Sequence, residues 1–470
     1  MKKDKFILNA SVTPALLIIT GSFLVVIYGI LFLLSTQLDF SHRRVASEEA
    51  LHIAEAGINY YRWHLAHAPD DFQDGTENEG PYIHTYTDPQ GNEIGSYSLE
   101  IIPPFNGSSI VTIRSTGSSN SRPNIKRTIV AQYGKPSLAQ FVFLNNGSVW
   151  YGPGITINGN VHSNNGIRMD GVNTGIIASA KDEYRCGSET GCSPPQWRPG
   201  VWGSGGDQGL WQFPVPPVDF GSIAFDFANM RDAARDEGLY LDESNREGYH
   251  LTFSANGTVI INRVTQTSSI DGYSVPGEGL GKNGQGGCRR RYQIIDNEEL
   301  VGTYDISENP IIFAEDQLWV EGVVKGRVTV VAAGFPVTSA TMDIWIRNNI
   351  TYTTHDGSDA LGLIAQNDIY FVRDVPTDFR IDGALMAQKG RVIRHGYFDW
   401  CGGTYNAIRN SLLINGALIT YNKSYWNYGT DPLLSGFITR TINYNGNFLY
   451  GPPPYFPTTG EYQFISWKEE

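Results

Sequence analysis

Four side chains in the C-terminal part of the chain are candidates for acid–base chemistry: Asp368, Asp378, Asp382 and His395. Two carboxyl groups about 5–10 Å apart can hydrolyse a glycosidic bond. Aspartates at the corners between short strands also accept hydrogen bonds from backbone N–H groups, and this role explains the same residues. The sequence holds no Ser–His–Asp set and no His-x-x-x-His pair. We therefore predict no catalytic residues and no enzyme activity; a polysaccharide lyase or hydrolase is the second alternative.

Two loops are candidate sites for a phosphate group or a metal ion. Gly281-Lys282 comes nearest to a phosphate-binding loop, but Pro276 replaces its first glycine and Asn283 its final Ser or Thr. Asp356–Asp359 offers two carboxylates, fewer than a calcium site needs. A formal net charge of −13, with Arg289–Arg291 as the single basic cluster, excludes a nucleic-acid surface. We predict no cofactor, no metal and no nucleic-acid partner.

Four tryptophans, Trp150, Trp197, Trp202 and Trp211, could stack on sugar rings. This possibility defines the first alternative function, a surface adhesin or carbohydrate-binding protein with surface glycans as partners. Packing beneath neighbouring loops is the simpler explanation of these side chains, and we favour it.

The cysteines indicate an oxidising compartment. Cys186 and Cys192 enclose five residues, a poor spacing for a zinc knuckle, so the sequence favours a local disulfide. Cys288 and Cys401 lie in glycine-rich turns and could form a second disulfide or remain free thiols.

A long run without a charged side chain, Phe6–Leu38, precedes all of these candidates. Its central part, Pro14–Leu34, is long enough at about 1.5 Å per residue to cross a hydrocarbon layer of about 30 Å. Fourteen of its residues are Leu, Ile, Val or Phe, and together they favour insertion by about 4–8 kcal/mol. Ser35–Asp39 does not provide the small-x-small exit of a cleaved signal. We predict a transmembrane helix over residues 14–34.

The charges that flank the span bear on its orientation. Three lysines lie in Lys2–Lys5 and two arginines at Arg43-Arg44, a small positive-inside bias. Together with the cysteines, this bias predicts a cytoplasmic N-terminus over residues 1–13. The protein is then a single-pass membrane protein whose C-terminal body is extracytoplasmic, in the periplasm or at the cell surface.

Beyond the span, apolar residues recur at spacings of three and four, at Leu51, Ala54, Ile58, Tyr61 and Leu65. This is the stripe of an amphipathic helix that packs on the following domain or on other subunits. The helix either continues from the membrane or restarts near Ser47, and it ends near Pro69.

Glu48–Ile58 reads Glu-Glu-Ala-Leu-His-Ile-Ala-Glu-Ala-Gly-Ile. It resembles the A-x-x-x-A-E-A-G helix that follows the membrane span in PilX-type pilin-like proteins of type IV pili. The resemblance ends near Leu65 and implies a long helix whose apolar half also packs in a filament core. It also implies pilin-like subunits or pilus assembly proteins as partners. Phe6 follows Lys5, where processed pilins have Gly, and Ala10 stands where they have Glu. These departures leave open both prepilin peptidase processing and entry into a filament.

The residues after the helix predict an antiparallel meander. Four strands are expected at 82–87, 94–102, 109–115 and 124–133, joined by turns rich in Pro, Gly, Asn and Asp. With the preceding helix they form a predicted pilin-like module over residues 35–133.

From residue 134 to 470 an apolar-x-Gly-x-apolar motif recurs, at Ile157–Val161, Val320–Val324, Ile381–Leu385 and Ile414–Leu418. Short strands that repeat at intervals of about 20 residues, with glycine at the corners, predict a right-handed parallel β-helix, a solenoid. An ordinary β-sandwich is the alternative.

Two parts of this body are expected to differ from the repeat. We predict an insertion at about 181–310, with a helix over 220–237 capped by Asp219 and a hairpin around 254–257. The aromatic tail 452–467 is expected to cap the end of the solenoid. The fold class is therefore mainly β with a long N-terminal helix. The predicted function is a non-enzymatic, membrane-anchored, pilin-like component of a type IV pilus or related surface assembly system.

Overall fold

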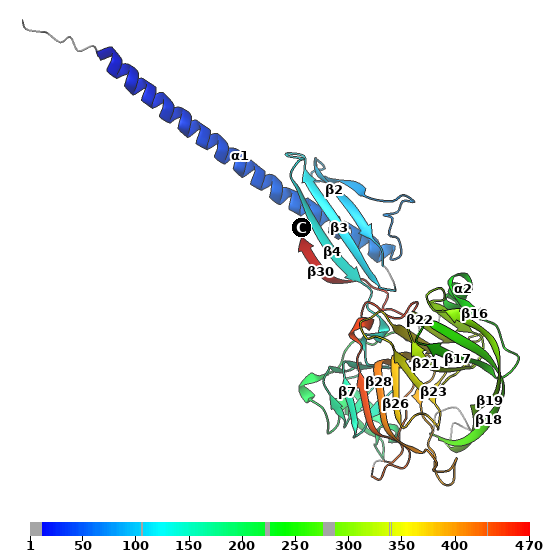
Figure 1. Cartoon of the computed structure of the whole chain (residues 1–470). Coiled ribbons are helices and arrows are strands. Elements are labelled where there is room, and N and C mark those ends of the chain that lie inside the picture. Colours follow the sequence, from blue (N-terminus) through cyan, green and yellow to red (C-terminus); the bar gives the residue numbers. More distant parts are fainter. Residues whose placement is uncertain are drawn as a thin grey trace, which may run out of the picture. The chain divides into compact units, whose positions relative to one another are not determined.

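The computed structural model describes residues 12–104, 107–220, 226–275, 287–337, 339, 341–429 and 431–470. The chain is mainly β with one long N-terminal helix, as predicted (Figure 1). It divides into two compact units. Unit 1 comprises Met1–Pro103, Val111–Gly134 and Tyr462–Glu470, and unit 2 comprises Pro104–Ile110 and Lys135–Glu461.

Helix α1 (Val12–His67) is continuous through Ser47 and ends just before Pro69. Every residue from 12 to 38 is exposed. The second half buries one face, which the 3–4 spacing predicted and which comprises Ala46, Ala50, Ile53, Ala54, Gly57, Ile58, Tyr61 and Leu65. One continuous helix thus carries an unpacked apolar half and a packed amphipathic half.

The packed half lies on a five-stranded antiparallel sheet in unit 1. The strand order is β1-β2-β3-β4-β30. Its members are β1 (Tyr82–Thr87), β2 (Glu93–Ile102), β3 (Ile110–Ser119), β4 (Lys126–Gly134) and β30 (Gln463–Glu469). The four strands predicted from the sequence are therefore confirmed to within a few residues, and the fifth comes from the C-terminus.

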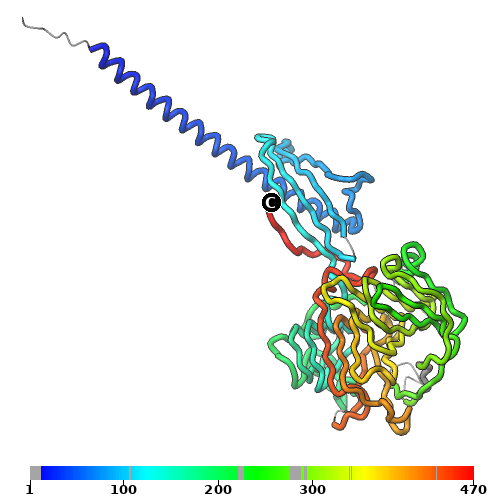
Figure 2. The backbone as a smooth tube through the Cα atoms, in the orientation of Figure 1, coloured from blue at the N-terminus to red at the C-terminus, as the bar shows by residue number. Residues whose placement is uncertain are grey.

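Unit 2 is built mainly of short strands that pair in parallel (Figures 1 and 2). One long ladder joins β16 (Leu239–Leu241), β20 (Ile311–Ala314), β22 (Arg327–Ala332), β24 (Ala360–Ala365), β26 (Asp378–Ala387), β28 (Ile408–Thr420), β5 (Phe143–Asn145), β8 (Val161–Ser163), β11 (Ile177–Ser179) and β15 (Trp211–Gln212). Its inner side chains belong to a single large apolar core.

Further parallel ladders complete unit 2. A second ladder joins β17 (Gly248–Ser254), β21 (Leu318–Val324), β23 (Ile344–Tyr352), β25 (Ile369–Phe371) and β27 (Val392–Ile393). A third joins the first halves of β26 and β28 to β29 (Gly436–Asn443), β7 (Ile155–Asn158) and β10 (Val172–Asn173). A short one joins β6 (Val149–Tyr151), β9 (Ile167–Met169) and β14 (Val201–Trp202).

Three copies of the recurring sequence motif, at 157–161, 381–385 and 414–418, begin in the third ladder, whereas the copy at 320–324 lies in the second. Asn158 donates to Asn443 at 2.8 Å, Asn443 to Asn415 at 2.8 Å, and Asn415 to Asp382 at 2.7 Å, each through its side-chain amide. The polar residues of these three copies therefore stack in one column, together with Asn443 of β29, which is not part of a motif copy. The following glycine is required as well, because a Cβ on Gly416 (φ 157°) would collide with the carbonyl oxygen of the glycine opposite it in β26.

The interval 181–310, predicted as an insertion, also contributes to these ladders. Strands β14 to β17 pair in parallel with neighbours outside the interval. Its remaining elements are a hairpin of β12 (Glu183–Cys186) and β13 (Gln196–Pro199), the helix α2 (Asp226–Glu237), and a long hairpin of β18 (Thr258–Ser274) and β19 (Gly287–Asp305). The predicted helix is confirmed over Asp226–Glu237, and so is the predicted turn after β17; Phe220 lies in a bend after Asp219 instead of in the helix.

The C-terminal tail does two different things. Residues 452–457 lie on the body as expected: Arg327 donates to the carbonyl oxygen of Pro452, and Phe456 is 3% exposed. The prediction is wrong for the last residues, because β30 pairs with β4 in unit 1 and brings Trp467 opposite Ala131. This pairing satisfies the backbone groups of β4, which would otherwise be an open sheet edge.

Candidate anchor helix and ligand pocket

The four candidate acid–base residues occupy structural positions. Asp368 accepts hydrogen bonds from the Arg391 backbone N–H and the Tyr370 hydroxyl, both at 2.8 Å. His395 is 1% exposed and its ring stacks on Tyr370 with centroids 5.2 Å apart. Asp378, on β26, is exposed and accepts from side chains of the neighbouring strand β28. Its pKa is lowered first by the hydroxyl of Ser411 that bonds to it.

Asp382 is the most constrained of the four, with an exposure of 0%. Its carboxylate accepts hydrogen bonds from the Tyr352 backbone N–H at 3.0 Å and the Asn415 amide at 2.7 Å. It also pairs with the Arg380 guanidinium at 3.0 Å and lies 3.1 Å from His355 Nε2. This network holds the corner of β26 in place.

The loops considered for metal and phosphate have structural roles or lie outside the described residues. Asp356 accepts from the backbone and hydroxyl of Ser358, and Asp359 from the Gly326 N–H and Thr353 hydroxyl. Across the described ranges, no three His, Cys, Asp or Glu side chains gather as metal ligands would. Gly281-Lys282 falls outside the described residues.

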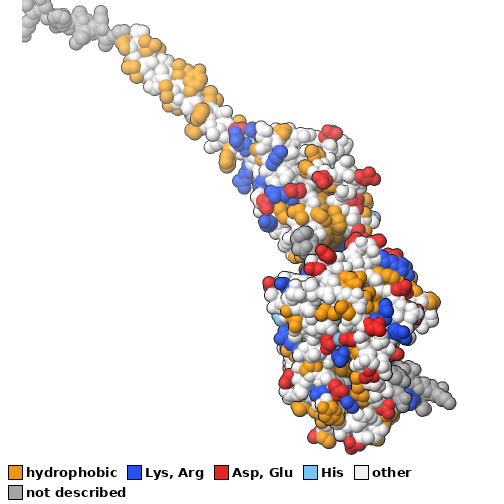
Figure 3. Space-filling view, turned by 45° about the vertical axis from the view of Figure 1, so that its right-hand side comes forward, with side chains coloured by type: hydrophobic (Ala, Val, Ile, Leu, Met, Phe, Trp, Pro, Cys, Tyr) orange, Lys and Arg blue, Asp and Glu red, His pale blue; other side chains and the backbone are white. Residues whose placement is uncertain are grey.

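The first half of α1 presents a long, exposed apolar surface (Figure 3). Exposed fractions include 67% for Leu17, 73% for Val25 and 72% for Phe32. Among the described residues, α1 is the one helix that could cross a membrane by length and composition. A surface this apolar requires a lipid or protein environment.

The second half of α1 approaches its sheet closely. The residues that meet there are small: Ala50, Ala54 and Gly57 on the helix, Gly95 and Gly117 on the strands. A Cβ built on Gly117 would overlap the Ala50 carbonyl oxygen, and one built on Gly57 would overlap the Ser115 hydroxyl. The Ala-x-x-x-Ala-Glu-Ala-Gly pattern is thus the contact surface between helix and sheet.

Polar contacts fix the helix along this sheet. Asp39, at the end of the apolar run, pairs with Arg43 at 2.8 Å and Arg122 at 2.5 Å, and these bonds lower its pKa. Further along the helix, the Glu49 carboxylate accepts a hydrogen bond from Ser119 at 2.6 Å. The apolar half therefore begins where the contacts with the sheet end.

Gly57→Leu is expected to destabilise unit 1 by about 3 kcal/mol, because the new side chain must displace Ser115 and Tyr97. The change is measured as the loss of amide hydrogen-exchange protection in β2, β3 and β4 of the full chain. Gly29→Leu is the control, since nothing lies within 4 Å of a Cβ at Gly29 on the same helix. Equal protection in both variants would contradict the close approach.

Unit 2 contains a cavity of about 880 Å³ beside β6 and the segment that links β28 to β29. Aromatic rings from both sides form its walls, among them Trp150, Tyr425 and Tyr428. Two basic side chains, Lys423 and Arg440, also line it. The four candidate acid–base residues do not contribute to this lining.

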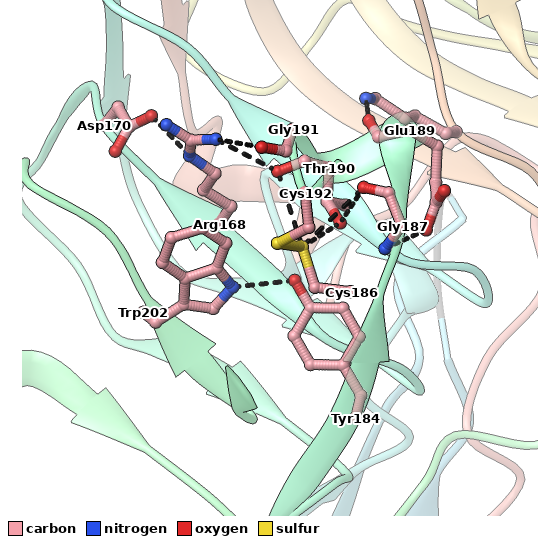
Figure 4. Close-up of a disulfide and its surroundings, with 11 residues drawn as sticks. Arg168, Asp170, Tyr184, Cys186, Gly187, Glu189, Thr190, Gly191, Cys192 and Trp202 are labelled. Atoms are coloured by element: carbon pink, nitrogen blue, oxygen red, sulfur yellow. Dashed lines mark hydrogen bonds and ion pairs between the residues drawn. A yellow bond between two sulfur atoms is a disulfide. The ribbon is translucent and has the colours of Figure 1, made fainter. Parts of the chain in front are cut away.

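The four tryptophans have different surroundings. Trp150 lines the cavity, and its indole N–H donates to Asp170 at 2.8 Å. Trp202 donates to the hydroxyl of Tyr184 at 2.8 Å (Figure 4). Trp197 is 68% exposed, whereas Trp211 packs against the large core of unit 2. Of the four candidates, Trp150 alone belongs to the lining of this cavity.

The predicted disulfide between Cys186 and Cys192 is confirmed and closes a loop beside the cavity (Figure 4). The Thr190 carbonyl in this loop accepts from Arg168 at 3.2 Å, whose guanidinium lies 4.3 Å from the Trp150 ring centroid. Ser188 and Glu189 of the loop line the cavity. The loop is thus one wall of the cavity. The second pair, left open by the sequence, is also bonded as Cys288–Cys401.

Sequence reasoning missed most of the cavity lining. Lys423, Tyr425, Tyr428 and Arg440 belong to no motif, and they meet Trp150 only because β28, β29, β5 and β7 pair across distant parts of the chain. The one available signal was the density of aromatic residues between 421 and 428.

A contact between the buried His250 and Glu321 links the stability of unit 2 to pH. His250 lies 2.8 Å from Glu298 and 3.0 Å from Glu321, and its bond to Glu321 is the first cause of that carboxyl's lowered pKa, with Arg347 adding to it. A lowered carboxyl pKa stabilises the fold above its unfolded value of 4.5, and this stabilisation is lost as pH falls below that value.

Glu321→Gln is therefore expected to reduce the decline in the free energy of unfolding between about pH 5 and pH 3. Chemical denaturation at several pH values measures it. The exposed Glu299 provides the control, Glu299→Gln, which should keep the decline of the native chain. Parallel pH profiles for the native chain and Glu321→Gln would refute this role.

No protein-family model matches the sequence. No curated protein matches it either. Among solved structures, the crystal structure of the competence-associated pilin ComZ from Thermus thermophilus aligns with a TM-score of 0.27 and 13% sequence identity, over 91% of this chain and 98% of that chain. At that TM-score the likeness supports no argument about fold or function.

Proposed function

We propose that the chain is a non-enzymatic, single-pass membrane protein that serves as a pilin-like structural component of a type IV pilus or related surface assembly system. The proposal rests on the two halves of helix α1. Its residues 12–38 are exposed and mostly apolar, and its later residues are seated on an antiparallel sheet. Residues 14–34 would lie in the bilayer, with residues 1–13 in the cytoplasm.

The same helix identifies the partners of this proposal. In the PilX-type proteins that Glu48–Ile58 resembles, the apolar half of the helix also packs against other subunits. Here that half has no packing partner within the described part of the chain. Pilin-like subunits or pilus assembly proteins are therefore the proposed protein partners, and lipid the alternative environment.

Unit 2 would be the exported body, a right-handed parallel β-helix. The parallel ladders and the stacked Asn158, Asn443, Asn415 and Asp382 side chains support this architecture, because stacked identical positions are typical of repeated coils. Two disulfides support export, because disulfides persist in oxidising compartments.

Surface-glycan binding is the second candidate function. The aromatic cavity of unit 2 favours it, because planar rings stack on the apolar faces of sugars. A β-helix lyase or hydrolase has less support, since Asp368, Asp382 and His395 are buried within structural contacts.

Cells that express the full chain test the first proposal. We expect the chain in the membrane fraction, with unit 2 digested by protease added outside the cytoplasmic membrane. Protection of unit 2 from protease that reaches the outer face of the cytoplasmic membrane would refute export. N-terminal sequencing, together with shearing of the cells, then distinguishes two forms of the proposal. An intact N-terminus indicates a protein that stays in the membrane. A new N-terminus near Phe6, with recovery in sheared filaments, indicates a pilus subunit.

A further inference from the structure

The cavity of unit 2 contains two cations without carboxylate partners. Lys423 Nζ donates to the carbonyl oxygen of Glu189, and Arg440 donates to that of Pro153. Within the described part of the chain, neither side chain forms an ion pair. The carboxylate of Glu189 is engaged with its own loop, where it accepts from the Gly187 N–H at 3.1 Å.

Both cations are partly removed from water. Burial lowers the pKa of Lys423 to about 8 and that of Arg440 to about 10. Glu189 opposes the shift of Lys423, whereas the nearby cations Arg168 and Arg391 reinforce it. A desolvated charge without a bonded carboxylate is costly, and an anion in the cavity would offset that cost.

The remaining lining fits a sugar ring. The Lys423 ammonium lies 5.6 Å from the Trp150 ring centroid and 5.0 Å from that of Tyr425, so both rings adjoin the same cation. Ser424 and the exposed Asp431 supply a hydroxyl and a carboxylate for sugar hydroxyl groups. A volume of about 880 Å³ accommodates more than one monosaccharide.

We propose that this cavity binds an acidic saccharide, with the carboxylate of a uronic or sialic acid between Lys423 and Arg440 and its ring against Trp150 and Tyr425. This inference rests on the second candidate function and names its ligand class. The disulfide loop supplies the Glu189 carbonyl that holds Lys423 toward the cavity. Of these four residues, Trp150 alone is among the tryptophans that the sequence indicated as candidates for stacking on sugars.

The test uses the full chain in detergent micelles and a panel of immobilised oligosaccharides. The panel contains hexagalacturonate, hexamannuronate, a hyaluronan hexasaccharide and sialyllactose, each beside its neutral methyl ester. We expect at least one acid to bind, with its methyl ester at least about tenfold weaker, because the ester cannot form charge-assisted hydrogen bonds.

Variants assign the binding to the cavity. Lys423→Gln and Arg440→Gln are each expected to weaken the acidic ligand about tenfold and to leave the methyl ester unchanged. Lys423→Arg retains the charge and should retain acid preference, and Lys325→Gln, an exposed lysine elsewhere in unit 2, is the control. Affinity for the acid should fall as pH rises above about 8, because Lys423 then loses its proton.

The possible outcomes distinguish binding of an acidic saccharide from binding of glycans in general. Equal binding of acids and methyl esters would overturn the acidic class and leave glycan binding intact. Absence of binding by every saccharide in the panel would overturn both. Acid binding that survives Lys423→Gln and Arg440→Gln together, in a variant with native thermal stability, would overturn the cavity as the site.

Discussion

The double variant Leu24→Arg, Ile27→Arg is expected to leave the membrane fraction almost completely. Both side chains are about half exposed on α1, at 54% and 48%, and neither packs on unit 1. The native apolar residues of 14–34 favour insertion by about 4–8 kcal/mol. Two arginines near the centre of the span oppose it by about 5–7 kcal/mol, which cancels most or all of that preference.

Membrane flotation of the full chain measures this effect. Val45→Arg is the matched control, because Val45 is 53% exposed on the same helix but lies beyond the predicted span. It should float with the native chain. Flotation of the double variant together with the control would contradict the assignment of residues 14–34 to the bilayer. Unchanged hydrogen-exchange protection in the sheet of unit 1 would show that the fold itself is intact.

Asp382→Ala is expected to destabilise unit 2 by about 1–3 kcal/mol, because the buried Tyr352 N–H would lose its acceptor. The carboxylate is 0% exposed, and its loss would leave Arg380, the Tyr352 N–H and the Asn415 amide without their acceptor. The chain of side-chain hydrogen bonds that runs from Asn158 through Asn443 and Asn415 would also lose its final acceptor. Chemical denaturation followed by tryptophan fluorescence reports on unit 2, because eight of the ten tryptophans lie there.

Asp378→Ala provides the control on the same strand. Asp378 is exposed and bonds to Asn410 and Ser411 at the surface, so its removal should change stability little. Similar stability of the two variants would contradict the structural role that the geometry assigns to Asp382.

Local patterns account for the elements that the sequence predicted well. The uncharged run and the 3–4 stripe are properties of neighbouring residues; the stripe and the described part of the run, from Val12 onward, lie in the single helix α1. The four strands of residues 82–134 are joined by local turns, which fix their pairing. The apolar-x-Gly motif likewise predicted positions that are in register in β26 and β28, where Gly383 lies opposite Gly416.

Where the prediction failed, contacts between distant residues decide the structure. Strand β30 pairs with β4 although most of the chain separates them, and nothing in the tail itself distinguishes a cap from a fifth strand. The interval 181–310 is locally irregular in sequence, yet its strands join the ladders at their ends. Pairing of this kind depends on which edge is open, and that is known only after the rest has folded.

The sequence by itself determined the apolar helix, the antiparallel strands, the local disulfide and the repeated motif, because short-range periodicity and spacing encode them. Tertiary structure alone decided that Asp382 is buried and bonded to the Tyr352 backbone and the Asn415 amide. It also brought Lys423 and Arg440 to one cavity with Trp150. Burial and charge pairing are relations between distant segments, so the residue types did not reveal them.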